Sequence, residues 1–184
     1  NSIQADWMCM LCNTDEDNGP HRNKTLIMVP LNDPAVSRSQ LKKLGLHCSD
    51  TGHLHFDEVR VPQRYRIGEE GMGFKYQMEQ FQEERMFSVA RTCTALEMAL
   101  EETIEYTRQR IAFGRPVLDN QVMHYKMADI QSQIEAARAL LYRAVDIYTA
   151  GGEVTKLASM AKYLVGVMAS EVPSQLLQFW GGQG

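Results

Sequence analysis

The amino-acid sequence lacks several features that would place it in a specialised class of protein. Its 184 residues contain no apolar run near the roughly 20 residues that a membrane-spanning helix needs. No basic segment followed by an apolar run marks a signal peptide. Four cysteines are too few for a disulfide scaffold. With 19 basic and 23 acidic residues the net charge is −4, which gives no electrostatic reason to bind nucleic acid or an anionic membrane surface.

What remains is the composition of an ordinary globular protein. Hydrophobic residues make up 44% of the chain and charged residues 23%, a balance that argues against disorder. The chain contains no internal repeat and no low-complexity segment. The length predicts one domain or at most two.

The distribution of glycine and proline changes part way along the chain. Residues 1–74 contain six glycines and four prolines, with short apolar runs between them. Trp7–Cys12 and Thr25–Val29 each read as a buried strand. The alternation over Leu54–Val61 predicts another strand, with a bulge near Asp57. This part of the chain is therefore predicted to be β-rich.

The rest of the chain has a helical pattern. Residues 75–112 and 117–150 contain neither glycine nor proline, and apolar residues recur with the helical period. A third helix is predicted from about Glu153 to Trp180, and Pro173 is expected to kink or split it. Antiparallel bundles usually close with four helices. Three helices, together with a start inside a β-rich region, indicate a piece of a larger enzyme.

Three short motifs resemble ligand sites but do not meet their requirements. Cys9 and Cys12 lie three residues apart on a predicted strand, so their side chains point to opposite faces and cannot both bind one metal. His53 and His55 share a strand face, but no third ligand is evident. Gly71-x-Gly73 lacks the third glycine of the dinucleotide-binding fingerprint, and a turn that opens the first helix is preferred. We predict no metal site.

Three other segments have both an ordinary and a functional interpretation. Glu83-Glu84-Arg85 is a solvated charge run, or it supplies a carboxylate base with an apolar wall from Met86-Phe87. Arg110-x-x-Phe113-Gly114-Arg115-Pro116 is a basic helix end, or an arginine fork for phosphate with an aromatic ring beside it. Gly181-Gly182-x-Gly184 is a helix cap, or a place where a bulky ligand approaches the backbone.

Taken together and in this order, the motifs resemble the acyl-CoA dehydrogenase family of flavoenzymes. The resemblance covers essentially the whole chain, and its more specific parts are the Arg-x-x-Phe-Gly segment and the terminal Gln-x-x-Gly-Gly-x-Gly. It is carried by Ala5-Asp6-Trp7, Gly45-Leu46-His47-Cys48-Ser49-Asp50-Thr51, Phe56-Asp57-Glu58-Val59-Arg60-Val61-Pro62, Gly71-x-Gly73-Phe74, Glu84-Arg85, Gln109-Arg110-x-x-Phe113-Gly114-Arg115-Pro116, Gln121, Ile134-Glu135-Ala136-Ala137-Arg138 and Gln178-x-x-Gly181-Gly182-x-Gly184.

The resemblance implies an α+β fold, with a β-sandwich or barrel-like segment followed by an antiparallel helical bundle. Residues 1–68 would be the C-terminal part of the family's middle β-domain. Residues 69–184 would be a truncated C-terminal helical bundle. The Glu84-Arg85 pair is closest in type to the long-chain and isovaleryl branch, which places its catalytic base on this helix.

The implied activity is FAD-dependent α,β-dehydrogenation of fatty acyl-CoA thioesters to trans-2-enoyl-CoA. Electrons would pass to an electron-transferring flavoprotein. The alternatives are an acyl-CoA oxidase-type enzyme and a non-enzymatic helical interaction module that kept the fold. The protein would be a homo-oligomer, a dimer or a dimer of dimers, in the mitochondrial matrix if eukaryotic and in the cytoplasm if bacterial. The fragment alone is expected to be inactive.

The resemblance also assigns roles residue by residue. Glu84 matches the catalytic base, unless the base lies after Gly184. Ser49 matches a CoA contact, and Arg85 matches the helix arginine beside the active site. The FAD contacts, made across a dimer interface, would come from Arg110, Phe113, Gln121, Gln178, Gly181 and Gly182.

Overall fold

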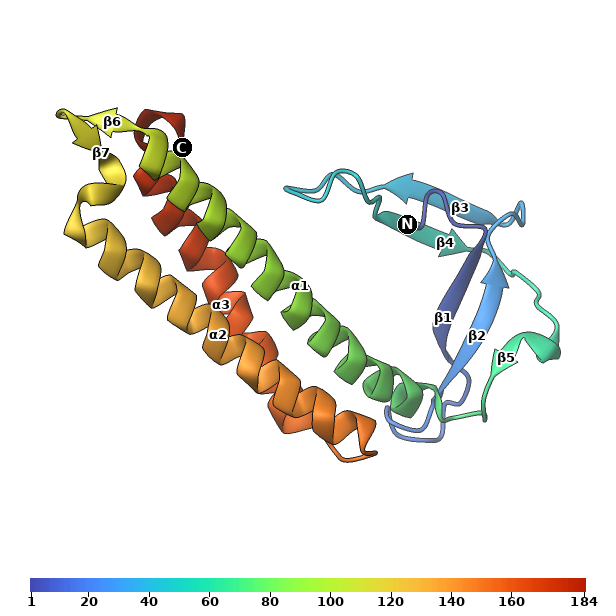
Figure 1. The fold of residues 1–184 in the computed structure, drawn as a ribbon. Helices are drawn as coiled ribbons and strands as arrows, with labels where there is room; N and C mark the ends of the chain where they lie inside the picture. The colour runs from blue at the N-terminus through green and yellow to red at the C-terminus, as the bar shows by residue number, and fades with distance from the viewer. The chain divides into compact units, whose positions relative to one another are not determined.

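The computed structural model describes residues 1–184 and divides into two compact units, Asn1–Glu79 and Gln80–Gly184 (Figure 1). The first unit consists mainly of antiparallel strands. They are β1 (Trp7–Asn13), β2 (Lys24–Pro30), β3 (Val36–Gln40), β4 (Gly52–Phe56) and β5 (Arg66–Ile67), with a short 3₁₀ helix, η1 (Gln63–Tyr65).

The strands of the first unit form two small open sheets rather than a closed barrel. β2 is the central strand of one sheet, paired with β1 on one side and with β5 on the other. β3 and β4 form the second sheet. Leu26 and Val29 on this central strand are buried, at 8% and 2% exposure. The predicted strands over Trp7–Cys12 and Thr25–Val29 are confirmed as strands. The burial predicted for Trp7–Cys12 is wrong, because β1 is paired only with β2 and none of its residues is buried.

The predicted strand over Leu54–Val61 is too long. β4 ends at Phe56, and Glu58 has a φ of +51°, in the left-handed region. A bulge keeps the residues on both sides of it paired with the neighbouring strand, whereas the pairing of β4 with β3 ends at Phe56 and a bend follows. The alternation in the sequence is compatible with both, because each inserts an extra residue into the pattern. The predicted bulge near Asp57 is therefore wrong.

The second unit is a helical bundle. Its long elements are α1 (Gly73–Gln109), whose first turns belong to the first unit, α2 (Gln121–Thr149) and α3 (Thr155–Trp180). The connection from α1 to α2 is a small hairpin, β6 (Ile111–Ala112) and β7 (Arg115–Pro116), followed by η2 (Val117–Asp119). A last 3₁₀ turn, η3 (Gly181–Gln183), ends the described chain.

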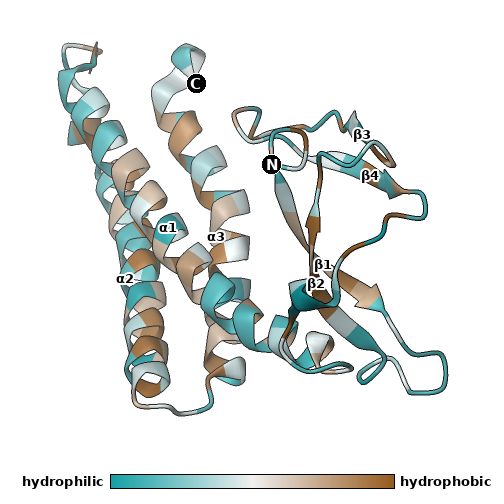
Figure 2. Ribbon diagram, turned by 90° about the vertical axis from the view of Figure 1, so that its right-hand side faces the viewer, coloured by the Kyte–Doolittle hydropathy of each residue, from teal (hydrophilic) through white to brown (hydrophobic).

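All three helices are amphipathic and share one hydrophobic core. Figure 2 shows hydrophobic and hydrophilic residues interspersed along each of them. Core residues recur three or four positions apart along each helix, and among the most buried are Val89 and Leu100 on α1, Ile130 and Ile134 on α2, and Val165 on α3. These side chains are at most 2% exposed, and burial of each contributes about 1.5–3 kcal/mol. No helix combines the length and apolar character required of a transmembrane span.

Of the two outcomes predicted at Pro173, a kink or a split of α3, the split does not occur. The helix continues from Thr155 to Trp180 through Pro173, so the predicted split is wrong. Proline removes one backbone donor and crowds the preceding turn, at a cost of about 3 kcal/mol. Buried Met168, Val172 and Leu176 lie on both sides of it and keep the helix packed in the core.

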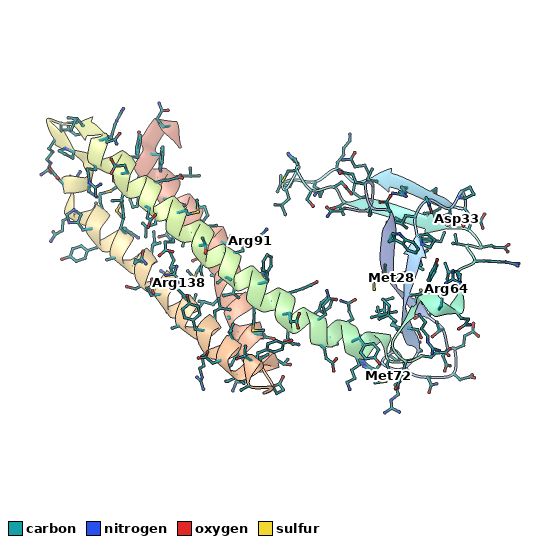
Figure 3. All side chains as sticks on the ribbon, turned by 45° about the vertical axis from the view of Figure 1, so that its right-hand side comes forward. Met28, Asp33, Arg64, Met72, Arg91 and Arg138 are labelled. Carbon is teal, nitrogen blue, oxygen red and sulfur yellow. The ribbon has the colours of Figure 1, made fainter.

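An ion-pair network reinforces the contact between α1 and α2. Arg138 on α2 (labelled in Figure 3) donates from Nη2 to Glu97 Oε2 on α1, over 2.6 Å. Its Nη1 donates to Glu135 Oε1 over 2.8 Å. Glu97 and buried Cys93 lie one helical turn apart on α1, so the network flanks the core.

Candidate functional site

The C-terminal ends of α1 and α3 border a groove of about 680 Å³, here called the terminal groove. Four of the predicted cofactor contacts come together in it: Arg110, Gln178, Gly181 and Gly182. Its remaining lining residues are Tyr106, Val117, Val122, Met123, Lys126, Phe179, Trp180 and Gln183. The lining thus includes two cationic side chains and no carboxylate, although the whole chain has a net charge of −4.

The backbone holds Arg110 firmly at the edge of the terminal groove. Arg110 follows the last residue of α1, and its N–H still donates to Tyr106 O over 2.9 Å. Its carbonyl accepts the Val117 N–H over 2.8 Å, which closes the β6–β7 hairpin. The arginine is therefore fixed on both sides while its guanidinium remains exposed.

The glycine turn on the other side of the groove needs a glycine at one position. Gly181 has φ +60° and ψ −131°, a conformation that residues with a side chain rarely adopt. Gly182 has no positive φ, and a Cβ placed on it would meet no atom within 4 Å. The two glycines therefore differ: the fold itself requires only the first.

Phe113 and Gln121 do not line the terminal groove. Phe113 sits at the tip of the β6–β7 hairpin with a φ of +54° and a fully exposed ring. Gln121 is the first residue of α2, and its Nε2 donates to the Tyr125 hydroxyl over 3.3 Å. In a single chain both residues therefore point into solvent, outside the groove formed by the other four.

Sequence reasoning did not single out Tyr106 and Trp180, which the structure brings together. Their rings stack with centroids 4.1 Å apart and planes 8° from parallel. The Tyr106 hydroxyl donates to Trp180 O over 3.2 Å, and Trp180 Nε1 donates to Thr103 Oγ1 over 3.1 Å. The only hints in the sequence were that Tyr106 lies one turn before Arg110 and that Trp180 directly precedes Gly181.

The neighbouring carboxylates Glu83 and Glu84 have different partners. Glu83 accepts a hydrogen bond from the Tyr148 hydroxyl and so joins α1 to the end of α2. Glu84 is exposed and accepts a hydrogen bond from Gln80 Nε2, one turn earlier, over 3.0 Å. Glu84 is thus the carboxylate that is not engaged with another helix of the bundle.

The apolar wall predicted beside Glu84 is only partly present. Met86 is buried in the bundle core, on another side of α1. Phe87 is 70% exposed and follows Glu84 by three residues, which places it on the same helix face. Arg91, labelled on α1 in Figure 3, continues this exposed stripe one turn further. The wall therefore consists of Phe87 alone in this unit.

Arg85 lies on a different side of α1 from Glu84. It borders a second groove of about 730 Å³ between α1 and α3, whose lining includes Lys162, Tyr163 and Ser170. Its Nη1 donates to Gln82 Oε1 over 3.1 Å. The predicted base and its neighbouring arginine therefore face apart, as their adjacent positions on a helix require.

Ser49 belongs to the first unit and lines a pocket of about 430 Å³ with Lys42, Lys43 and His47. Its hydroxyl donates to Asn1 Oδ1 over 3.0 Å, and its carbonyl accepts a hydrogen bond from Lys43 Nζ. The surroundings of Ser49 are therefore basic. No group of three or more histidine, cysteine, aspartate or glutamate side chains is placed to hold a metal ion.

Comparison with known proteins identifies the family. Residues 71–184 match the family described as acyl-CoA dehydrogenase, C-terminal domain. The chain belongs to the acyl-CoA dehydrogenase family. An acyl-CoA dehydrogenase of Bacillus subtilis is 36% identical over 185 residues, which cover 100% of the chain and 48% of that relative. The chain spans about half the length of the curated relatives it matches.

Solved structures confirm the acyl-CoA dehydrogenase fold. An acyl-CoA dehydrogenase from Geobacillus kaustophilus superposes with a TM-score of 0.94 at 35% identity, over 100% of this chain and 49% of that one. A butyryl-CoA dehydrogenase from Megasphaera elsdenii gives a TM-score of 0.92 at 34% identity, over 98% and 47%. The fold class inferred from the sequence, strands followed by an antiparallel helical bundle, is confirmed.

The chemical groups that this chain offers to a ligand are found in three places. The terminal groove offers cationic, amide and backbone groups, which suit an anionic ligand with polar ends. The middle of α1 offers an exposed carboxylate beside an aromatic ring. The basic pocket around Ser49 offers lysine side chains. Cationic groups suited to an anion and an exposed carboxylate therefore occur in different parts of the chain.

Proposed function

We propose that the protein containing this chain is an FAD-dependent acyl-CoA dehydrogenase, which converts an acyl-CoA thioester to the trans-2-enoyl-CoA. The observation that carries the proposal is the terminal groove, where four residues of the family motifs meet with two cations and no carboxylate. Membership of the acyl-CoA dehydrogenase family supports it. The proposal names acyl-CoA thioesters as the substrate class without assigning a chain length.

The residues of the terminal groove fit the phosphate-bearing part of FAD. Arg110 offers a planar fork of donors and Lys126 a second positive charge, and both match a diphosphate. Gln178 offers an amide for polar ligand atoms, and the turn at Gly181 offers backbone unobstructed by side chains. By family resemblance, the flavin held here belongs to the neighbouring subunit. The chemistry that FAD supplies when bound is acceptance of the hydride from the β-carbon.

Replacement of Arg110 tests this assignment. A charge-assisted arginine–phosphate contact contributes about 1.5–3 kcal/mol, so Arg110→Ala should weaken FAD binding about tenfold or more. Arg110→Lys should restore only part of it, because lysine has no fork. Arg108→Ala is the matched control, since Arg108 also lies at the end of α1 but pairs with Glu105. Equal FAD retention in the Arg110 and Arg108 alanine variants would contradict the assignment.

Glu84 is proposed as the base that removes the α-proton of the thioester. It is exposed, it is not bonded to another helix, and it matches the Glu-Arg pair of the branch that carries its base here. Proton transfer requires the carboxylate within about 3 Å of the α-carbon. Phe87, on the same face of α1, would help to exclude water from an acyl chain bound there.

Two glutamine variants separate the base from its neighbour. Glu84→Gln cannot accept the proton, so reduction of the flavin by acyl-CoA should fall by several orders of magnitude, roughly 10²–10⁴-fold for loss of a general base. FAD content should stay normal. Glu83→Gln keeps an oxygen that can accept the Tyr148 hydrogen bond, so it should reduce flavin at close to the wild-type rate. Wild-type reduction by Glu84→Gln, measured in stopped flow, would place the base elsewhere.

We further propose an electron-transferring flavoprotein as the electron acceptor and a homo-oligomer as the working assembly. The helical unit leaves large apolar side chains exposed, among them Phe113, Tyr125, Tyr142, Tyr163 and Leu177. Such residues support association between copies of the chain. A monodisperse monomer in sedimentation of the intact protein would refute the assembly. Rapid hydrogen peroxide formation in air would favour an oxidase instead.

A further inference from the structure

Three residues join the last turns of α1 and α3, and we call them the terminal clasp: Thr103, Tyr106 and Trp180. The clasp has two hydrogen bonds that run in opposite directions. The Tyr106 hydroxyl on α1 donates to Trp180 O on α3, and Trp180 Nε1 on α3 donates to Thr103 Oγ1 on α1. The stacked rings lie between these bonds, 4.1 Å apart.

Each polar group of the clasp has a partner. Thr103 is 1% exposed, and its hydroxyl donates in turn to Ala99 O over 2.7 Å. The Trp180 carbonyl is one of the last four of α3, which lack partners within a helix, and the Tyr106 hydroxyl fills that vacancy. A half-buried indole and phenol are thereby fixed in one orientation relative to each other.

The clasp lies directly beside the groups assigned to the cofactor. Tyr106 is one helical turn before Arg110, and the Arg110 N–H donates to the Tyr106 carbonyl over 2.9 Å. Trp180 directly precedes Gly181, and both clasp rings line the terminal groove. The clasp therefore links the end of α1 that carries Arg110 to the end of α3 that leads into the glycine turn.

We propose that Tyr106 and Trp180 are positioning residues, which hold Arg110 and the Gly181–Gln183 turn at the spacing that the FAD diphosphate requires. The inference rests on the proposed function of the terminal groove. Positioning matters here because a bidentate arginine contact and a backbone contact must form together on one ligand. A flexible groove would bind FAD more weakly, because binding would then cost the conformational entropy of ordering these groups.

The test measures FAD affinity of the intact protein after removal and titration of the cofactor. Tyr106→Phe keeps the stacked ring and removes one hydrogen bond, so FAD affinity should fall about three- to tenfold. Trp180→Phe keeps a ring and removes the other bond, with a similar expected effect. Because Thr103→Val removes the acceptor of that same bond, its combination with Trp180→Phe should cost less than the sum of the two single changes.

Tyr148→Phe is the matched control. It also removes a tyrosine hydroxyl that joins two helices of the bundle, but this hydroxyl donates to Glu83, outside the terminal groove. If the clasp has a purely structural role, Tyr106→Phe and Tyr148→Phe should both lower the melting temperature. At temperatures well below melting, neither variant should then change FAD affinity. Positioning predicts weaker affinity for the Tyr106 variant alone, with normal flavin reduction once FAD is saturating.

The outcomes separate this inference from the proposed function. If Arg110→Ala weakens FAD binding and Tyr106→Phe and Trp180→Phe do not, the clasp has no positioning role and the proposed function stands. If Arg110→Ala also leaves affinity unchanged, the terminal groove does not hold FAD and both proposals fail. Should Tyr106→Phe fail to fold, Trp180→Phe decides the question.

Discussion

Gly181→Ala and Gly182→Ala should affect FAD binding for different physical reasons, although the same motif contains both glycines. At Gly181 the backbone has φ +60° and ψ −131°. An added Cβ would meet no atom within 4 Å, so the cost of alanine is backbone strain rather than a steric clash. Such strain amounts to about 1–3 kcal/mol. In the free protein the turn can relax and release most of it.

Ligand binding would restore the strained conformation at Gly181. If FAD requires the observed turn, the strain of about 1–3 kcal/mol converts to an affinity roughly 5- to 150-fold lower for Gly181→Ala. Gly182→Ala introduces no backbone strain, and the free protein should be unchanged or slightly more stable. If Gly182→Ala nevertheless binds FAD more weakly, the reason would be that the ligand itself lies close to Gly182.

The assay is a pair of measurements on each variant: thermal unfolding of the cofactor-free protein and FAD titration by isothermal calorimetry. Gly181→Ala should unfold at a slightly lower temperature and bind FAD more weakly. Wild-type FAD affinity in Gly181→Ala would refute the reasoning, because it would mean that the observed turn is not the conformation that binds. If cofactor-free Gly182→Ala were less stable than the wild type, the turn would not accept a side chain at Gly182, contrary to its geometry.

Two further predictions concern the stability of each unit. In the helical unit, Arg138→Met and Glu97→Gln should each cost about 1–2 kcal/mol, since the ion pair spans 2.6 Å between side chains 22% and 31% exposed. Their double mutant should show coupling, and additive effects in thermal unfolding would contradict a link between the helices. In the first unit the Ile3 N–H, donating to Asp50 Oδ1 over 2.8 Å, lowers the pKa of that carboxyl. Its stabilising contribution should therefore be complete above about pH 4 and decline as the pH falls further, and Asp50→Asn should abolish this part of the acid transition.

The sequence predicted the helices well because their signal is local. Long segments free of glycine and proline, with apolar residues three and four apart, leave few alternatives to a bundle. The sequence could not decide whether the helix continues through Pro173, because packing on both sides of the proline, not local propensity, decides this. The end of β4 was missed because a left-handed Glu58 and a bulge produce the same pattern of alternation.

The parts of the candidate site that consist of short sequence motifs could be predicted. The parts formed by residues far apart in the sequence could not. Arg110 and Gly181 could be named from short motifs, and the structure places both in one groove. The pairing of Tyr106 with Trp180 joins residues 74 positions apart, and a single sequence has no signal for such a contact. The expected role of Met86 beside Glu84 failed because residues two apart on a helix face different directions.

Because Glu83 and Glu84 have different partners, insertion of one residue into this segment should disturb it more than substitution of one residue does. One residue step rotates the helix by about 100°, which is all that distinguishes a carboxylate bonded to Tyr148 from one facing solvent. Replacement of one of the two glutamates therefore alters one carboxylate without moving the other. Insertion of a single residue between Glu84 and Met86 would affect both, since it would turn the two carboxylates away from their present directions while the core of α1 stayed in place. Related chains that retain this helix are thus expected to vary in the residues around the pair but not in their number.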